Sequence, residues 1–432
     1  MKQNRSLPEL NHHSAKTSEK QVFYGRRMII VAFVVDFIAV GFFFYSYGVF
    51  FKEIAHEFGG SRLQAALGLT VANGVAAIAS PFLGRALDEY PIKNLMVAGA
   101  TTVSIGFLLL SQITAQWQFY LILGSFIALG TTTMGGLAAS KLVANWFILK
   151  RGTALGLATM GISLSGMIMP LIATWLISVI GWRGAFIAYA GGTMGLVVPI
   201  VLLFVINRPE DINQHPDGNS SQSTTDVIIP PTNTSTKQIL THPTFWIISL
   251  TFALVLSSLG PILTNMIPFI TDMGISPYRA ASVLSLSAGA GVLGKIVFGW
   301  LADNLDTRMT VIASILAQLL GVTFLTQASE YATLLIAAMI FGFGMGGVVP
   351  LQATITGKIF GREYFGKVMG LLRPTMMPIT LIGLPLSNWI YDTYGSYQAA
   401  FKISIGAYIL AIFIISKLNL NNQISTQVHT RT

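Results

Sequence analysis

Three charged side chains lie inside long apolar stretches of the sequence: Asp36, Lys295 and Arg373. An unpaired charge of this kind costs about 2.5–3.5 kcal/mol in the middle of a membrane-spanning helix, so each needs a partner or a function. Their formal net charge is +1, and it becomes +2 when Asp36 binds a proton. Two cations near one carboxylate would attract a small anion. Asp36 would then neutralise the empty site, or carry a proton that moves with the anion.

The composition predicts a polytopic helical membrane protein without a sizeable soluble domain. The 432 residues are 53% hydrophobic and 10% charged, whereas soluble domains carry about 25% charged residues. The chain has no cysteine, which excludes disulfides, thiolate metal sites and a cysteine nucleophile. No phosphate-binding loop, metal-ligand cluster or nucleophile constellation occurs, so we expect no enzyme, no cofactor, no metal site and no ATP-driven motor.

Twelve apolar stretches are long enough to cross a hydrocarbon core of about 30 Å as helices. The first six are expected at 28–51, 63–83, 94–113, 117–140, 153–179 and 184–206. The second six are expected at 243–269, 279–301, 309–327, 331–353, 367–390 and 397–417. Residues 207–242 between them are polar and predict a flexible linker, and residues 1–27 and 418–432 form polar tails.

Basic residues predict the orientation of these spans. Most Lys and Arg residues fall in the tails and the even-numbered loops, so we expect both termini and the linker to be cytoplasmic. Their place in short loops also argues against nucleic acid as the partner behind the net charge of +9. Lys141, near the end of the fourth span, is expected to extend its ammonium to the cytoplasmic surface. The absence of cysteine and of a cleavable signal favours a bacterial inner membrane.

The two halves of the chain are related by an internal repeat. A shift of 215 residues superimposes the following pairs: Gly84 and Gly299, Asp88 and Asp303, Lys93 and Arg308. We expect these two loops to act as gates, with each Asp capping a helix or pairing with a basic residue. Parallel halves of six spans each place a substrate site between them, near the membrane midplane.

The three buried charges break this repeat. Each lies about 9–12 Å from the cytoplasmic end of its span, at 1.5 Å per residue. Their repeat-related positions, near Leu250, Ser80 and Thr159, carry no charge. A purely structural interpretation would make Asp36 and Arg373 an ion pair that ties the halves together, and would let Lys295 extend to the cytoplasmic surface.

The two G-x-x-x-D-x-x-x-x-[K/R] loops resemble the signature of the major facilitator superfamily. This implies an all-α polytopic membrane protein with twelve transmembrane helices in two pseudo-symmetric six-helix bundles. Four further segments resemble the monocarboxylate transporter and oxalate/formate antiporter branch: 45–52 (YSYGVFFK), 145–152 (NWFILKRG), 181–186 (GWRGAF) and 268–274 (PFITDMG). The resemblance implies a cation in the eighth span that holds the substrate carboxylate, here Lys295, and a second in the eleventh, here Arg373.

We therefore expect a secondary active transporter of a small mono- or dicarboxylate, working by alternating access through proton symport or anion exchange. Further candidates to line the substrate site are Tyr45, Asn73 and Asn265. The alternative is a major facilitator for another solute: an exporter of drugs or siderophores, or a carrier of amino acids or sugar phosphates. A non-transporting sensor is disfavoured, because the linker and tails are too short for a partner domain. The expected partners are an anionic small molecule, protons and the lipid bilayer, with the monomer as the working unit.

Overall fold

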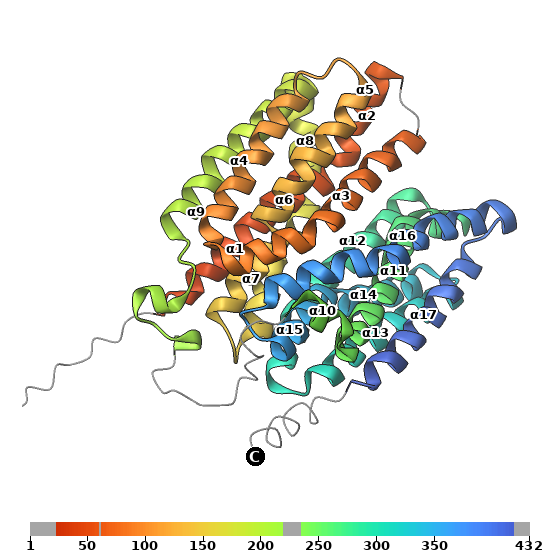
Figure 1. The fold of residues 1–432 in the computed structure, drawn as a ribbon. Coiled ribbons are helices and arrows are strands. Elements are labelled where there is room, and N and C mark those ends of the chain that lie inside the picture. The colour runs from red at the N-terminus through yellow and green to blue at the C-terminus, as the bar shows by residue number, and fades with distance from the viewer. Residues whose placement is uncertain (1–22, 60–61, 219–234, 419–432) are drawn as a thin grey trace, which may run out of the picture.

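In the computed structural model, which describes residues 23–59, 62–218 and 235–418, the chain forms two helical bundles joined by the linker (Figure 1). Helices and the loops between them make up the whole of this described part, and no strand occurs in it. The N-terminal bundle contains the helices up to α9, and the C-terminal bundle contains α11 to α17.

In the N-terminal bundle the first span consists of α1 (Gly25–Val40), η1 (Gly41–Tyr45) and α2 (Tyr47–Phe58). The second span is α3 (Arg62–Glu89), and the third is α4 (Ile92–Leu110). The fourth is α5 (Gln116–Ile122), η2 (Leu123–Ala128), α6 (Leu129–Met134) and α7 (Gly136–Trp146). The fifth span and the start of the sixth lie in α8 (Arg151–Gly192), and the sixth continues through η3 (Thr193–Val197) and α9 (Val198–Phe204). The segments η1, η2 and η3 are single π-helical stretches, so the first, fourth and sixth spans deviate locally from the α-helix.

The C-terminal bundle has α11 (Pro243–Asp272), α12 (Pro277–Asn304) and α13 (Thr307–Gln327) as its first three spans. It continues with α14 (Tyr331–Gly346) and α15 (Val348–Phe360) as one span, then α16 (Phe365–Tyr394) and α17 (Gln398–Ser416). Short helices η4 (Pro209–Ile212), η5 (Pro216–Gly218) and α10 (Thr236–Thr241) lie in the linker.

The prediction of twelve spans is confirmed. Eleven continuous helical stretches of the described chain are long and apolar enough to cross a membrane. One of them, Arg151–Phe204, is 54 residues long and holds the fifth and sixth spans together. Gly181 separates these two spans with φ +69° and ψ 167°, a left-handed conformation that favours glycine.

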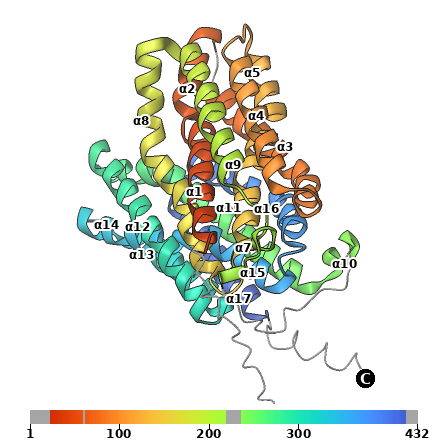
Figure 2. The same cartoon turned by 90° about the vertical axis from the view of Figure 1, so that its left-hand side faces the viewer.

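The two bundles meet at one end and separate at the other. The joined end carries the start of α1, the end of α9 and the end of α17, so it is the end of the termini and the linker (Figures 1 and 2). The bundles contact each other mainly through two helix pairs, α3 with α16 and α8 with α12. Toward the opposite end, α2 and α5 of one bundle lie well apart from the far ends of α16 and α17 (Figure 1).

Glycines allow the backbones to touch at the joined end. A Cβ on Gly84 of α3 would collide with the backbone carbonyl of Gly366 in α16. The repeat-related Gly299 of α12 meets the carbonyl of Gly152 in α8 in the same way. Each contact leaves no space for a side chain, so glycine is required by close approach of the backbones rather than by backbone conformation.

Aromatic stacking fixes the first span against the sixth. Phe42 of η1 stacks on Tyr189 of α8 with centroids 3.9 Å apart, and Phe50 of α2 stacks on Phe186 at 4.1 Å. The Ser46 and Tyr189 hydroxyls share a hydrogen bond of 2.9 Å. These contacts hold the helix that carries Asp36 in a defined position within its bundle.

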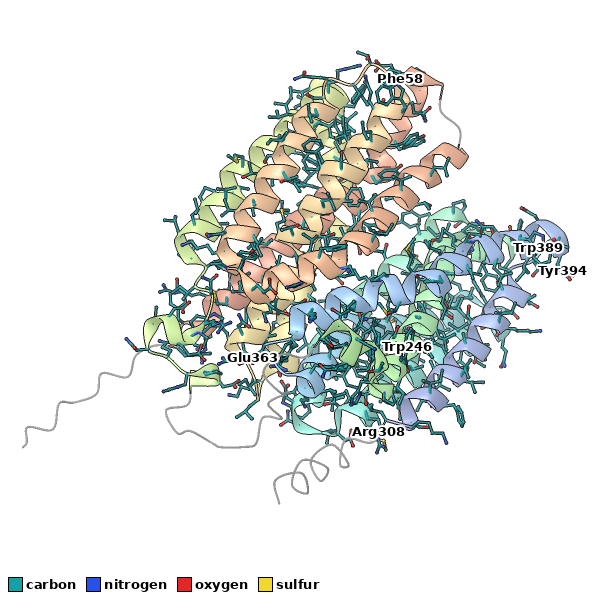
Figure 3. The ribbon with its side chains drawn as sticks, in the orientation of Figure 1. Phe58, Trp246, Arg308, Glu363, Trp389 and Tyr394 are labelled. Atoms are coloured by element: carbon teal, nitrogen blue, oxygen red, sulfur yellow. The ribbon has the colours of Figure 1, made fainter. Side chains whose placement is uncertain are left out.

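Replacing Gly299 by Ala is expected to force the joined end apart, because the new methyl group meets backbone rather than a flexible side chain. The chain has no cysteine, so spin labels can be attached at introduced cysteines. Lys150 and Glu363 are exposed positions on the two bundles at this end, and Glu363 is labelled in Figure 3. Electron paramagnetic resonance should show a longer distance between these labels in Gly299→Ala. Gly289→Ala, on the same helix but facing open space, should leave the distance unchanged.

Candidate functional site

Asp36 binds a free helix end in the interior of the N-terminal bundle. Its side chain is 1% exposed, and its Oδ1 accepts a hydrogen bond of 2.7 Å from the backbone N–H of Gly136. Gly135 leaves the helical conformation, with φ −105° and ψ −153°, and separates α6 from α7. The N–H of Gly136, the first residue of α7, therefore has no helical acceptor of its own, and a carboxylate at this end is favoured by the helix dipole.

Arg373 lies beside this same helix end. Its Nη2 atom is 3.4 Å from the position that a Cβ on Gly136 would occupy. Among the described residues, the Arg373 guanidinium has no hydrogen-bond acceptor in contact and no carboxylate within 4 Å. It does interact electrostatically with Asp36 at longer range. Arg373 thus presents an unoccupied fork of donors in the interior of the protein.

Lys295 crosses from the C-terminal bundle to the N-terminal one. It is 6% exposed, and its Nζ donates a hydrogen bond of 2.7 Å to the backbone carbonyl of Thr159 in α8. It also interacts electrostatically with Asp36. Its ammonium therefore stays inside the protein, whereas the purely structural interpretation expected it to reach the cytoplasmic surface.

The three charges converge at the boundary between the bundles. Both cations come from α12 and α16, the two C-terminal helices that form the joined end, and the carboxylate comes from α1. Asp36 interacts electrostatically with both Lys295 and Arg373. Within the described chain, however, Asp36 and Arg373 do not form the direct ion pair that the structural interpretation requires. Such charges act on one another strongly, because little water screens them.

The structure does not bring the other predicted lining residues to these charges. Asn265 is buried and donates a hydrogen bond of 3.0 Å to Ser387, which lies about 21 Å further along α16 than Arg373 at 1.5 Å per residue. The Tyr45 ring packs against Gly166 of α8, nearer the separated end than Asp36. Asn73 is exposed on α3. All three lie on the side of the charges where the bundles separate.

The two loop aspartates bind helix ends of the opposite bundle. Asp88 accepts hydrogen bonds from the backbone N–H groups of Gly366 and Lys367, at 3.0 and 2.7 Å, where α16 begins. Asp303 accepts from Gly152 and Thr153, at 2.6 and 2.7 Å, where α8 begins. Each carboxylate satisfies free donors and faces the positive end of a helix dipole, so both contacts stabilise the joined end.

Lys141 was predicted to extend to the surface, and this prediction is wrong. Its side chain is 2% exposed, and its Nζ lies 2.6 Å from Oδ1 of Asp88. It also donates a hydrogen bond to the backbone carbonyl of Arg362 in the opposite bundle. The carboxylate and the carbonyl compensate the ammonium inside the protein, so it has no need to reach water. Sequence reasoning missed this residue because the partner comes from another helix.

Lys93 and Arg308 do not join the two bundles. The backbone N–H of Lys93 donates to the Asn207 side chain, and the Arg308 guanidinium donates to the carbonyl of Leu418, at 2.9 Å each. Both partners belong to the same half of the chain as the basic residue. In the described residues, the Lys93 side chain makes no contact across the boundary.

The first part of the linker has fixed contacts, although its composition predicts flexibility. Asp217 accepts hydrogen bonds from three successive backbone N–H groups, of Ile148, Leu149 and Lys150. Glu210 forms an ion pair of 2.5 Å with Arg362 of the C-terminal bundle. Residues 207–218 therefore lie against the joined end and contact both bundles.

Twelve spans in two repeat-related bundles, with charges buried between them, define a membrane transporter rather than an enzyme. The family model described as Major Facilitator Superfamily matches residues 33–304 and 262–423. The chain belongs to this superfamily.

Relatives within the superfamily are monocarboxylate transporters. The chain is 27% identical over 402 residues to monocarboxylate transporter 13 of Rattus norvegicus, covering 90% of this chain and 87% of the relative. It is 26% identical over 398 residues to monocarboxylate transporter 11 of Homo sapiens, covering 90% and 81%. It is 24% identical over 390 residues to monocarboxylate transporter 12 of Xenopus laevis, covering 87% and 85%.

Solved structures share the fold. The Escherichia coli fucose:proton symporter aligns with a TM-score of 0.68 at 14% identity, covering 91% of this chain and 99% of the other. A second structure of that transporter, in the outward conformation, aligns with the same TM-score at 15% identity. At this identity the likeness concerns the fold alone.

Asp88→Asn is expected to destabilise the protein more than Asp303→Asn. Both variants lose a charge at a helix end, worth about 0.3–2 kcal/mol. Asp88→Asn also leaves the buried Lys141 without its carboxylate, and breaking a buried pair costs about 3–5 kcal/mol. Thermal denaturation of the purified protein in lipid nanodiscs measures the difference. Arg85→Gln, which removes an exposed pair with Glu89, should change little. Equal effects of the two aspartate variants would contradict a role for Lys141 in this contact.

Proposed function

We propose that the chain is a secondary active transporter of a small organic anion, a mono- or dicarboxylate, that binds between Arg373 and Lys295. Asp36 is the counter-charge of this site. The protein works by alternating access between the two bundles, in a bacterial inner membrane with both termini in the cytoplasm. The joined end is then cytoplasmic, and the conformation described here opens outward.

One observation carries this proposal: Arg373 has no hydrogen-bond acceptor or close carboxylate in the described interior, although it lies near Asp36. Arg373 is only partly exposed, and no described side chain or carbonyl accepts from its donors, so water alone offsets the free-energy cost of placing it there. Its planar fork matches a carboxylate, which can accept two hydrogen bonds at once. A substrate carboxylate would supply the missing acceptors.

Lys295 links the same site to the contact between the bundles. Its hydrogen bond to the Thr159 carbonyl spans the boundary, so this bond must break when the joined end opens. An anion near Lys295 would compete with that carbonyl for the ammonium. Substrate binding and separation of the bundles would therefore affect each other.

The gates are the repeat-related contacts of the joined end, formed by Gly84 with Asp88 and by Gly299 with Asp303. They close one end with helix caps and close backbone packing, both of which are lost when the bundles rotate apart. Lys93 and Arg308 support the gate loops from within their own bundles. Tyr45 and Asn73 lie toward the separated end, where a substrate would enter, whereas Asn265 is buried and bound to Ser387.

Charge balance and the relatives both support a carboxylate. The three buried residues sum to +1 when ionised, so one monoanion neutralises the site. With a proton on Asp36 the sum is +2, which suits a dicarboxylate or a monoanion that moves with a proton. The relatives are named monocarboxylate transporters. Amino acids and sugar phosphates also carry an anionic group, so they belong in the same test.

Uptake into proteoliposomes, from a panel of labelled carboxylates, amino acids and sugar phosphates, tests the proposal. Arg373→Gln and Lys295→Gln should each reduce uptake of the transported anion by at least tenfold, about 1.4 kcal/mol of lost interaction. Arg373→Lys keeps the charge but loses the fork, so we expect an intermediate loss. Lys402→Gln, which removes an exposed cation far from the site, is the control. Normal uptake by both Gln variants would refute the site.

Asp36→Asn separates the two coupling modes. If a proton moves with the substrate through Asp36, an imposed pH gradient should no longer drive accumulation in this variant. Exchange of internal for external anion needs no net proton movement and should persist. Accumulation driven by the gradient at the wild-type level would exclude Asp36 as the proton carrier.

A further inference from the structure

The half-helix α7 connects the buried charges to the joined end. It is 11 residues long, and Gly135 separates it from the rest of the fourth span. Its first residue, Gly136, binds Asp36. Lys141, five residues and about 7.5 Å further along the helix, binds Asp88. About one and a half turns of helix thus separate the candidate substrate site from the Lys141–Asp88 ion pair at the joined end.

The far end of α7 is anchored to the start of the linker. The Asn145 side chain donates a hydrogen bond of 3.0 Å to the Asn207 carbonyl, and the Trp146 indole donates one of 2.9 Å to the Ile206 carbonyl. Trp146 is fully buried. Because these hydrogen bonds hold the C-terminal end of α7, loss of the Asp36–Gly136 hydrogen bond would let the N-terminal end tilt. The tilt would displace Lys141, which lies between the two ends.

The contacts of α7 differ from those of its counterpart in the second half of the chain. A shift of 211 residues superimposes Met-Gly-Gly at 134–136 on Met-Gly-Gly at 345–347. In the second copy the residue matching Gly135 is Gly346, the last residue of α14, and the next residue, Gly347, stays close to helical, with φ −71° and ψ −23°. The residue matching Lys141 is Gln352, whose side chain contacts the sulfur of Met376. The half-helix α15 of the second copy carries Lys358, which interacts electrostatically with Asp303 but is exposed and donates to Ala302 and Thr307 of its own bundle. Among the described residues, only the first copy has a wide break, a bound carboxylate and a buried ion pair along the half-helix.

We propose that α7 transmits the charge state of Asp36 to the Lys141–Asp88 pair, with Gly136 and Lys141 as positioning residues. Ionised Asp36 holds the positive end of the α7 dipole, and this keeps Lys141 in register with Asp88. When Asp36 loses its charge to a proton, the N-terminus of α7 is released and the joined end opens more readily. The inference rests on the proposed function only in assigning a change of charge to Asp36 during transport.

The charged groups around each end of this connection are few. Lys295 from α12 and Arg373 from α16 face Asp36, and the Gly136 N–H faces it from α7. Lys141 faces Asp88 from α3, with Arg151 and Arg208 at longer range. Both arginines repel the ammonium, so the position of Lys141 depends on Asp88, on the Arg362 carbonyl and on the placement of α7.

A double-mutant cycle tests this coupling without any substrate. The protein carries spin labels at positions 150 and 363 in lipid nanodiscs, and the ratio of joined to open populations is measured. We expect Asp36→Asn to lower this ratio by about fivefold, as for loss of a charge at a helix end. Lys141→Gln should lower it by more, because it breaks a buried ion pair. The double variant should lower it no further than the larger single effect. Effects that multiply would show two independent interactions and overturn the proposal.

Two further variants exclude simpler explanations. Gly136→Ala keeps every charge but places a side chain at φ +27°, a conformation unfavourable to L-residues, so it should act like Asp36→Asn. Gly260→Ala, in a helix with open space around it, is its control. Lys141→Arg keeps a cation for Asp88 and should restore most of the joined population. An unchanged ratio in Gly136→Ala would mean that Asp36 acts directly on Lys295 and Arg373, and the role of α7 would be lost.

Failure of this inference and failure of the proposed function give different results. If Arg373→Gln abolishes anion uptake but Asp36→Asn leaves the label distances unchanged, the transport site stands and the coupling through α7 falls. If no anion is taken up but the cycle shows coupling, the substrate class is wrong and the role of α7 stands.

Discussion

A charge removed from water must be compensated inside the protein, and this chain compensates several of its charges across the boundary between the two bundles. Asp88 and Asp303 bind helix ends of the opposite bundle, and Lys295 binds a carbonyl of the opposite bundle. Because these partners sit on separate rigid bodies, their compensation depends on the conformation. The free-energy cost that makes an intramembrane charge rare would therefore oppose any separation of the bundles that breaks these pairings.

The joined end combines symmetry with an exception to it. Two glycine contacts and two aspartate caps repeat across the boundary, in positions related by the duplication of the chain. This arrangement explains why both halves kept the same loop. Asp36 and the wide break before α7 have no equivalent among the described residues of the second half, where Lys358 of α15 interacts with Asp303 but stays exposed. The fourth span therefore has buried contacts that its counterpart lacks. The asymmetry lies on the N-terminal bundle, whereas the two cations that interact with Asp36, Lys295 and Arg373, lie on the C-terminal one.

Arg373 differs from Asp36 and Lys295 because, among the described residues, it makes no direct hydrogen bond or ion pair, although Asp36 is near enough to interact electrostatically. The helix end next to it is already occupied by Asp36, and its own donors find no acceptor among the described residues. A protein tolerates such a group where a ligand completes its hydrogen bonds. Lys295, by contrast, already has an acceptor, which a ligand would have to replace.

The sequence by itself determined the frame: twelve spans, the break at Gly181, the repeat, and the three charges at similar depth. Each of these depends on hydropathy, glycine and residue spacing along one chain, which act locally. Only the tertiary structure decided which groups meet. Lys141 is buried rather than at the surface because Asp88 reaches it from another helix, and Asn265 binds Ser387 rather than the charges because α11 and α16 pack in that register. Residues 207–218 likewise have defined contacts because Asp217 and Glu210 bind groups of the two bundles. Composition cannot reveal such contacts.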